Sequence, residues 1–236
     1  MSNAVIQKLR ELKPNFHGSE DEPKNWMSQW DVLEYLAKTM GPDKSSLETG
    51  CGYSTVIFAA SGAKHTTVTP EASEEGRVRA FCESIGVDTS NLTFAIGPSS
   101  AALPTLDGEL DLMYIDGAHG FPHPCIDWMY TEGRLNIGGA MLVDDIRIPT
   151  CRMVHDFLLK EDNWSFDQFI GDTSIFEKTA ESPNSAEWML QGFNANYPDF
   201  SFLPATHNFK TKGRHVLRET VKAVGLEQPA RRLIGK

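Results

Sequence analysis

Three carboxylates stand where two apolar segments of the chain end. Asp116 follows the segment LDLMYI (residues 110–115), and Asp144 and Asp145 follow GGAMLV (residues 138–143). If the two segments are neighbouring parallel strands, the three side chains meet at one edge of the sheet. Clustered carboxylates repel one another unless a cation or hydrogen bonds hold them, and an all-oxygen set favours a hard ion such as Mg²⁺. The alternative is that Asp144 and Asp145 cap the next turn and that Asp116 contacts only a bound cofactor.

A histidine lies close to the first of these carboxylates. His119 comes three residues after Asp116, in a glycine-rich loop at the expected pocket. An imidazole accepts a proton near neutral pH, so His119 is a candidate general base, with Asp116 as a second catalytic residue. The alternative is that His119 is an ordinary surface turn residue. His17, far upstream, lies in a polar loop that could fold over the same pocket.

A glycine-rich turn indicates a bound cofactor. Residues 46–55 read SLETGCGYST, in which Gly50 and Gly52 let the backbone approach a ligand. The helix that follows offers free N–H groups to an anion. A dinucleotide turn would have a third glycine where Thr55 stands, and a phosphate loop would need a lysine that is missing here.

The polar residues around the turn indicate the chemistry of its ligand. Glu48 would repel a pyrophosphate but can hold an ammonium group, and Ser54 with the helix N-terminus can hold the matching carboxylate. Glu71, after the second strand, suits the hydroxyls of a ribose. Because a dinucleotide would use such an acid as well, Glu71 indicates a nucleoside without choosing between cofactors.

The elements that must position these residues alternate along the chain. The sequence predicts strands at 45–50, 65–70, 92–97, 110–117 and 138–146, and helices at 54–61, 73–86, 99–104, 123–135 and 150–160. This alternation predicts an α/β fold, a Rossmann-like sheet of five parallel strands with helices on both faces. Two more strands, 164–170 and 174–180, are separated by a gap too short for a crossover. They should form an antiparallel hairpin that closes the sheet.

Further segments flank this sheet on both sides. Amphipathic helices at 3–13 and about 26–40 predict an N-terminal helical cap over residues 1–42, before a cofactor-binding domain at 43–180. Residues 181–236 form an aromatic-rich and basic C-terminal extension. Its aromatic side chains either pack on the sheet or form a wall over the pocket.

Charge is distributed unevenly along the chain. The net charge is −10, and residues 201–236 hold eight Lys or Arg against two Asp or Glu, which leaves −16 for residues 1–200. An acidic body argues against non-specific nucleic-acid binding. The basic tail, with a helix expected at about 213–225, is typical of a docking or dimer contact, so a homodimer is expected.

Other features of the composition favour a cytoplasmic protein without a membrane partner. The four cysteines show no C-x-x-C pair and no zinc spacing, which suits reduced thiols. No segment has the length and apolar character of a signal peptide or a membrane span.

Taken in order, these motifs resemble a known family. SLETGCGYST, TVTPE, FAIGPSS, LDLMYIDGAH and GGAMLVDDIRIP look like the successive motifs of class I S-adenosylmethionine-dependent methyltransferases. The closest resemblance is to small-molecule O-methyltransferases of the catechol and macrocin types, over about residues 45–180. It implies a methionine site at the glycine turn, a ribose site at the second strand, an adenine site after the third and a sulfonium above Asp116. The residues implied for cofactor binding are Glu48, Gly50, Cys51, Gly52, Tyr53, Ser54, Glu71, Gly97, Ser99, Ser100 and Asp116.

The resemblance also implies a metal at Asp116, Asp144 and Asp145. The sequence departs from the family pattern at several positions. The catechol type has Asn where Asp145 stands and a lysine general base where His119 stands. Its glycine turn is longer, and Thr69 occupies the position of its usual ribose acid.

We therefore expect an S-adenosylmethionine-dependent enzyme that methylates a small-molecule acceptor at a hydroxyl oxygen, with Mg²⁺ assistance. Three alternatives stay open. The first is a metal-independent N- or O-methyltransferase of the same fold, and the second is an NAD-dependent oxidoreductase. The third is a non-catalytic protein that binds the cofactor and uses its tail to contact a partner.

Overall fold

The computed structural model describes residues 2–18, 22–24, 26–182 and 187–223. Contacts divide the chain into two units, residues 1–192 and 193–236. The N-terminal helices belong to the first unit, because α1 and α2 pack on α3. The first part of the expected C-terminal extension belongs to this unit as well.

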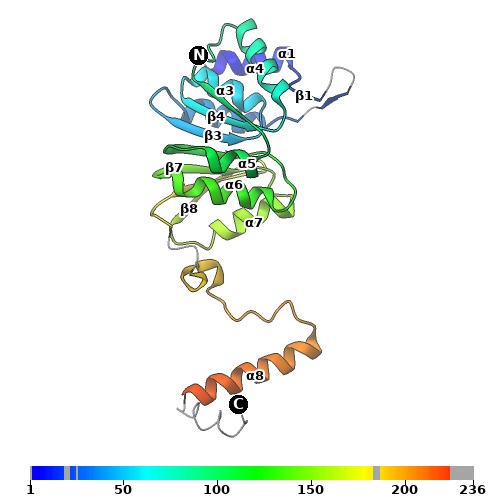
Figure 1. The fold of residues 1–236 in the computed structure, drawn as a ribbon, viewed down its shortest axis with the longest axis vertical. Coiled ribbons are helices and arrows are strands. Elements are labelled where there is room, and N and C mark those ends of the chain that lie inside the picture. Colours follow the sequence, from blue (N-terminus) through cyan, green and yellow to red (C-terminus); the bar gives the residue numbers. More distant parts are fainter. Residues whose placement is uncertain (1, 19–21, 25, 183–186, 224–236) are drawn as a thin grey trace. The chain divides into compact units, whose positions relative to one another are not determined.

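The first unit alternates strands and helices in the predicted order (Figure 1). Its helices are α1 (Ser2–Leu12), α2 (Trp30–Thr39), α3 (Tyr53–Ser61), α4 (Ala72–Ser84), α5 (Ser99–Ala102), α6 (His123–Thr131) and α7 (Pro149–Leu158). Its strands are β1 (His17–Gly18), β2 (Pro23–Lys24), β3 (Ser45–Thr49), β4 (Lys64–Thr69), β5 (Leu92–Ile96), β6 (Leu110–Ile115), β7 (Leu135–Val143), β8 (Trp164–Ile170) and β9 (Thr173–Lys178). Within the described residues, the turn-rich segment before α2 also forms a small β1–β2 pair, which the sequence did not predict.

The main sheet has seven strands in the order β5-β4-β3-β6-β7-β9-β8. β3 to β7 pair in parallel, and β8 and β9 form an antiparallel hairpin in which β9 also pairs antiparallel with β7. The predicted five parallel strands and closing hairpin are both confirmed.

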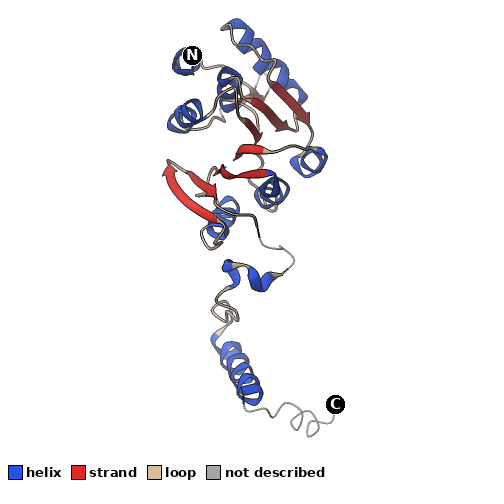
Figure 2. Ribbon diagram, turned by 90° about the vertical axis from the view of Figure 1, so that its left-hand side faces the viewer, coloured by secondary structure: helices blue, strands red, loops and turns tan. Residues whose placement is uncertain are grey.

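Helices cover both faces of this sheet (Figure 2). On β6, Leu112 and Tyr114 join a core formed with α1, α2, α3 and α4, whereas Met113 and Ile115 join a second core with α5 and α7. Successive side chains of a strand point to opposite faces, so a strand that is apolar throughout must be covered on both. The continuous apolar run of β6 follows from this central position.

The second unit contains α8 (Ala205–Ala223), which begins earlier than the helix expected at about 213–225. Phe209, Val216 and Leu217 are exposed on it. Across the part of the chain that the structure describes, no helix combines the length and the apolar character needed to cross a membrane.

Candidate active site

The candidate site lies where the parallel strands end. The turns after β3, β4, β5, β6 and β7 all lie at the carboxyl edge of the sheet, and ligands of open α/β sheets bind at this edge. The cofactor and metal residues expected from the sequence fall on or beside these five strand ends.

The glycine turn after β3 packs directly against the end of β6. Gly50 has a φ of +97°, and a Cβ atom at this position would lie 2.3 Å from the backbone oxygen of Asp116. Both observations require glycine. The backbone N–H of Gly52 donates to Thr55 Oγ1 at 2.9 Å, so Thr55 caps α3 in the place where a dinucleotide turn has its third glycine.

Glu48 is buried below the glycine turn. Its carboxylate accepts hydrogen bonds from Ser54 Oγ at 2.6 Å, Thr55 Oγ1 at 2.5 Å and Thr67 Oγ1 at 3.0 Å. His65 Nε2 lies 3.2 Å from the same carboxylate, and Glu48 is only 1% exposed. The sequence assigned Glu48 and Ser54 to opposite ends of an amino-acid ligand, but in the structure they bond to each other and hold the turn.

Two other side chains of the turn also lie in the core. Tyr53 packs against Phe16 and Trp30, with ring centroids 5.7 Å and 5.8 Å away, and is 5% exposed. Cys51 is buried, and burial together with Glu48 raises the pKa of its thiol far above the ordinary value. At these positions, the turn offers its backbone more than its side chains to a ligand.

The buried acid that follows β4 is Glu74, in the first turn of α4, and not Glu71. Glu71 is exposed, whereas Glu74 accepts hydrogen bonds from Thr69 Oγ1 at 2.5 Å and His17 Nδ1 at 2.7 Å. His17 Nε2 would lie 3.3 Å from a Cβ atom at Gly52, so the ring stands over the glycine turn. The sequence did not identify Glu74, because it looks like one of several charged residues of α4 and its partner His17 lies 57 residues away.

The loop after β5 carries the residues expected beside adenine. The backbone N–H of Gly97 donates to the carbonyl of Thr69 at 2.8 Å, which joins this loop to the end of β4. Ser99 begins α5 and is half-buried, while Ser100 is exposed.

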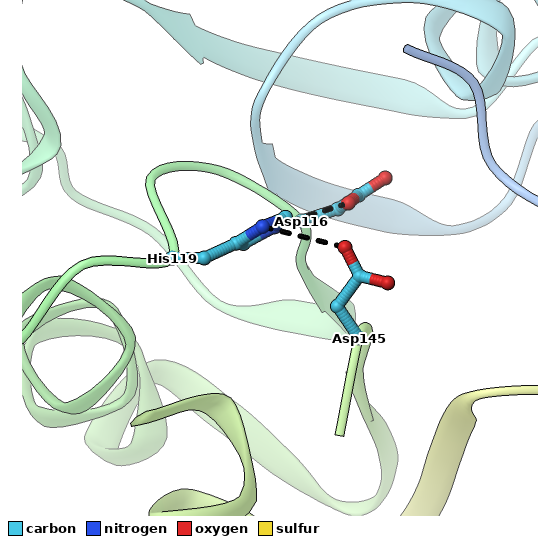
Figure 3. Close-up of side chains that lie close together, drawn as sticks. All are labelled: Asp116, His119 and Asp145. Atoms are coloured by element: carbon cyan, nitrogen blue, oxygen red, sulfur yellow. Dashed lines mark ion pairs between the residues drawn. The ribbon is translucent and has the colours of Figure 1, made fainter. Parts of the chain in front are cut away.

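Asp116, His119 and Asp145 form a cluster at the ends of β6 and β7 (Figure 3). His119 Nδ1 lies 3.3 Å from Asp145 Oδ2, and His119 Nε2 lies 3.8 Å from Asp116 Oδ1. One donor atom from each of the three residues lies within 4.8 Å of the others, a spacing compatible with one shared cation. Ser28, just before α2, donates to Asp116 Oδ2 at 3.0 Å and closes the cluster on that side.

Burial and mutual charge change the protonation of this cluster. Burial raises the pKa of Asp116 to about 7, although hydrogen bonds from His119 and Ser28 lower it. Burial also raises the pKa of Asp145, with the charge of Asp144 adding to the effect. The hydrogen bond to Asp116 and the nearby carboxylates raise the pKa of His119, despite the opposing effect of burial. The carboxylates therefore shift His119 toward its protonated form.

Asp144 is not one of the three clustered residues, whereas the sequence groups it with Asp116 and Asp145. Tyr114 OH donates to Asp144 Oδ2 at 2.7 Å, and Thr173 Oγ1 donates to Oδ1 at 2.5 Å. The N–H of Asp145 donates to the same Oδ1 at 2.9 Å. Asp145 has a left-handed φ of +52°, so the strand turns between the two aspartates. His119 takes the third place in the cluster that the sequence gave to Asp144.

Comparisons with known proteins agree with this geometry. Residues 47–146 match a family model described as a methyltransferase domain. No curated protein matches the chain in sequence.

The fold is similar to those of several solved structures. The cofactor-bound Rv0187 from MTB has a TM-score of 0.59 and 18% identity, over 77% of this chain and 90% of its own. The methyltransferase PaMTH1 from Podospora anserina, with bound SAH, has a TM-score of 0.58 and 16% identity, over 76% and 89%. The O-methyltransferase TomG from Streptomyces achromogenes, in complex with SAM, has a TM-score of 0.56 and 16% identity, over 75% and 89%.

Sheet order, strand-end site and comparisons together define a class I methyltransferase fold. The chain therefore has the fold of S-adenosylmethionine-dependent methyltransferases, as the motifs predicted, and residues 47–146 match a methyltransferase domain. The matched segment contains the glycine turn and all four charged residues at the ends of β6 and β7.

Proposed function

We propose that this protein transfers the methyl group of S-adenosylmethionine to a hydroxyl oxygen of a small-molecule acceptor. The observation that carries the proposal is the cluster of Asp116, His119 and Asp145 beside the glycine turn. It combines two carboxylates and an imidazole within reach of one acceptor. TomG, an O-methyltransferase with SAM in its structure, has a similar fold and supports the choice of oxygen.

The proposed cofactor site follows the strand ends. The backbone of Gly50, Cys51 and Gly52 and the N-terminus of α3 would receive the methionine carboxylate, as free N–H groups at a helix start favour an anion. Glu74 would hold the ribose hydroxyls, a role supported by its hydrogen bond from Thr69, the last residue of β4. The loop from Gly97 to Ser100 would flank the adenine.

The carboxylates of Asp116 and Asp145 are suited to a divalent cation such as Mg²⁺. Both carboxyl groups have raised pKa values and face each other across His119. A bound cation would reduce the repulsion between the two groups in their ionised forms. Such an ion would bind acceptor oxygens and lower the pKa of the reacting hydroxyl. Asp144, held by Tyr114 and Thr173, would support the backbone of Asp145 from behind.

His119 is the proposed proton acceptor. Its raised pKa comes mainly from Asp116 and the other carboxylates, so neutralising them returns the imidazole toward the neutral form that can act as a base. The acceptor hydroxyl must also point along the methyl–sulfur bond, and such positioning contributes roughly 7–11 kcal/mol to lowering a barrier.

A metal-independent reaction is a second candidate, favoured by the two contacts of His119 with carboxylates. An imidazolium at His119 lies near both Asp145 and Asp116 and can itself balance their charge. Turnover that survives EDTA unchanged would support this version, and turnover that needs added Mg²⁺ would support the first.

Cofactor binding and chemistry can be tested separately. At about 100 times its Kd, S-adenosylmethionine should add roughly 2.7 kcal/mol of stability in a thermal-shift assay, and NAD should add none. His119→Ala should keep this shift but slow S-adenosylhomocysteine production about 10²–10⁴-fold with an active hydroxyl acceptor. A shift with NAD alone would contradict the proposed cofactor, and unchanged turnover in His119→Ala would remove the base.

A further inference from the structure

The helix α8 of the second unit presents an apolar face for which the proposed function has no role (Figure 1). Residues three, four and seven positions apart lie on one side of a helix. On α8 this side carries Phe209, Gly213, Val216, Leu217 and Thr220. Phe209 is 85% exposed, Val216 63% and Leu217 65%. An apolar stripe of this kind normally packs against a second element, so we ask which molecule fits it.

Two residues of this apolar face are suited to close contact with another helix. Gly213 lies in the interior of α8, where glycine is less favourable than alanine. Apart from its chain neighbours and the backbone of its own helix, no atom of the described residues lies within 4 Å of a Cβ atom placed there. Thr220 Oγ1 donates to the carbonyl of Val216 at 2.8 Å, so its hydroxyl can be buried without a further partner.

The charged residues of α8 lie beside the apolar face. Three of them follow one another at intervals of four and form a basic stripe along another side of the helix: Lys210, Arg214 and Arg218. Lys212 and Glu219 are seven residues apart, so they share the opposite border of the apolar face. Lys212 Nζ lies 6.0 Å from the ring of Phe200, at the outer limit of a cation–π contact, and Lys212 is exposed. This border therefore carries one charge of each sign.

We propose that α8 pairs with α8 of a second copy of this chain, in antiparallel orientation across a twofold axis. If Gly213 packs against the partner's Val216, the antiparallel register also places Phe209 against the partner's Thr220. Each large side chain then faces a small one, which fills the interface without overpacking. In a parallel pair, Phe209 would instead meet the partner's Phe209, and Gly213 the partner's Gly213.

The same register brings opposite charges together. In an antiparallel pair, each border of the apolar face meets the same border of the partner, so Lys212 lies beside the partner's Glu219. The twofold axis repeats this contact, which gives two ion pairs and an interface that closes at a dimer. On the other border, the methylene groups of Lys210 cover the partner's Leu217. This complementarity of charge and size selects a second copy as the occupant of the face.

This contact differs from the one expected from the net charge of the basic tail. Most of the basic stripe lies away from the interface, and the contact is specified by the apolar face and by one charge of each sign. The proposed dimer does not depend on methyl transfer, so failure of either proposal leaves the other standing.

Sedimentation equilibrium of the full chain in low-salt buffer, where exposed ion pairs are least screened, measures the Kd of the dimer. Lys212→Glu and Glu219→Lys each place like charges beside one another at two sites and should raise the Kd about tenfold. An equal mixture of these two variants should recover the wild-type Kd, because both pairs are then opposite in charge again. Recovery by mixing is not expected from a general effect on stability.

Arg214→Glu is the matched control. It changes the charge by the same amount as Lys212→Glu, two residues away and on the basic stripe, and should leave the Kd nearly unchanged. Val216→Lys places a charge in the apolar face and should leave the protein monomeric, with its fold intact because Val216 is exposed in the single chain. Wild-type protein that stays monomeric at every concentration would overturn the inference, and the apolar face would then have another occupant. Equal effects of Lys212→Glu and Arg214→Glu, or a mixture that fails to associate, would overturn it as well.

Discussion

Replacing Gly50 by alanine tests the contact between the glycine turn and the end of β6. The substitution forces an L-residue into a φ of +97° and places its Cβ atom 2.3 Å from the carbonyl oxygen of Asp116. The backbone conformation alone costs about 1–2 kcal/mol. Displacing packed backbone adds about 1–3 kcal/mol, so a total loss of roughly 2–5 kcal/mol is expected.

Gly86→Ala provides the matched control for this prediction. Gly86 also has a left-handed φ, +72°, but apart from its chain neighbours no atom of the described residues lies within 4 Å of the position of a Cβ there. It should therefore lose only the conformational part, about 1–2 kcal/mol. The difference between the two variants isolates the contact with Asp116.

Urea denaturation of both variants measures the free energies of unfolding, and calorimetry measures cofactor affinity. Gly50→Ala should be less stable than Gly86→Ala and should bind S-adenosylmethionine more weakly, because the turn and Asp116 cannot both keep their positions. If the two variants differ by less than about 0.5 kcal/mol, within the error of additivity, the close packing of these strand ends is not what requires glycine.

Three further substitutions test the buried charges. Because the pKa of Asp116 is raised from 3.8 to about 7, its contribution to stability is present below 3.8 and is lost as the pH rises through 7. Asp116→Asn should remove this loss and be more stable than the wild-type protein at pH 8, by at most roughly 4 kcal/mol, while its turnover falls. Equal pH dependence of the free energy of unfolding in the two proteins would refute this prediction. Glu48→Gln should lose about 1.5–3 kcal/mol in urea denaturation, since three hydroxyls donate to Glu48, and a stability equal to wild type would exclude the network. Lys178→Met should lose about 1–3 kcal/mol, because Lys178 Nζ is buried and donates to the carbonyls of Glu132 and Leu135, and an unchanged denaturation midpoint would show that these carbonyls find other donors.

Local sequence was sufficient to predict the sheet and the turns that carry the site. The apolar runs of β3 to β7 and the short gap before β9 each reflect a pattern contained within one element and its neighbours. Gly50 and Gly52 were predicted for the same reason, since a turn after a strand is a local feature.

Side-chain pairings across the site were not predictable in this way. Ser28 meets Asp116 across 88 residues, and Thr173 meets Asp144 across 29. Each pair depends on how distant segments pack. A serine just before a helix can cap that helix or donate to a distant acid, and no local pattern in the sequence distinguishes the two roles. Asp144 instead accepts hydrogen bonds from Tyr114 of β6 and Thr173 of the closing hairpin, and no local pattern in the sequence indicates this.

The contacts of Ser28 and His17 limit how short a segment of this domain can be moved into another protein. Both residues precede the segment that matches the methyltransferase family, yet one donates to Asp116 and the other to Glu74. A chimaera that carried only residues 47–146 into another protein would transfer the strand ends without two of the groups that hold their acids. The segment that matches the family model is thus shorter than the segment that must be transferred to keep the site intact.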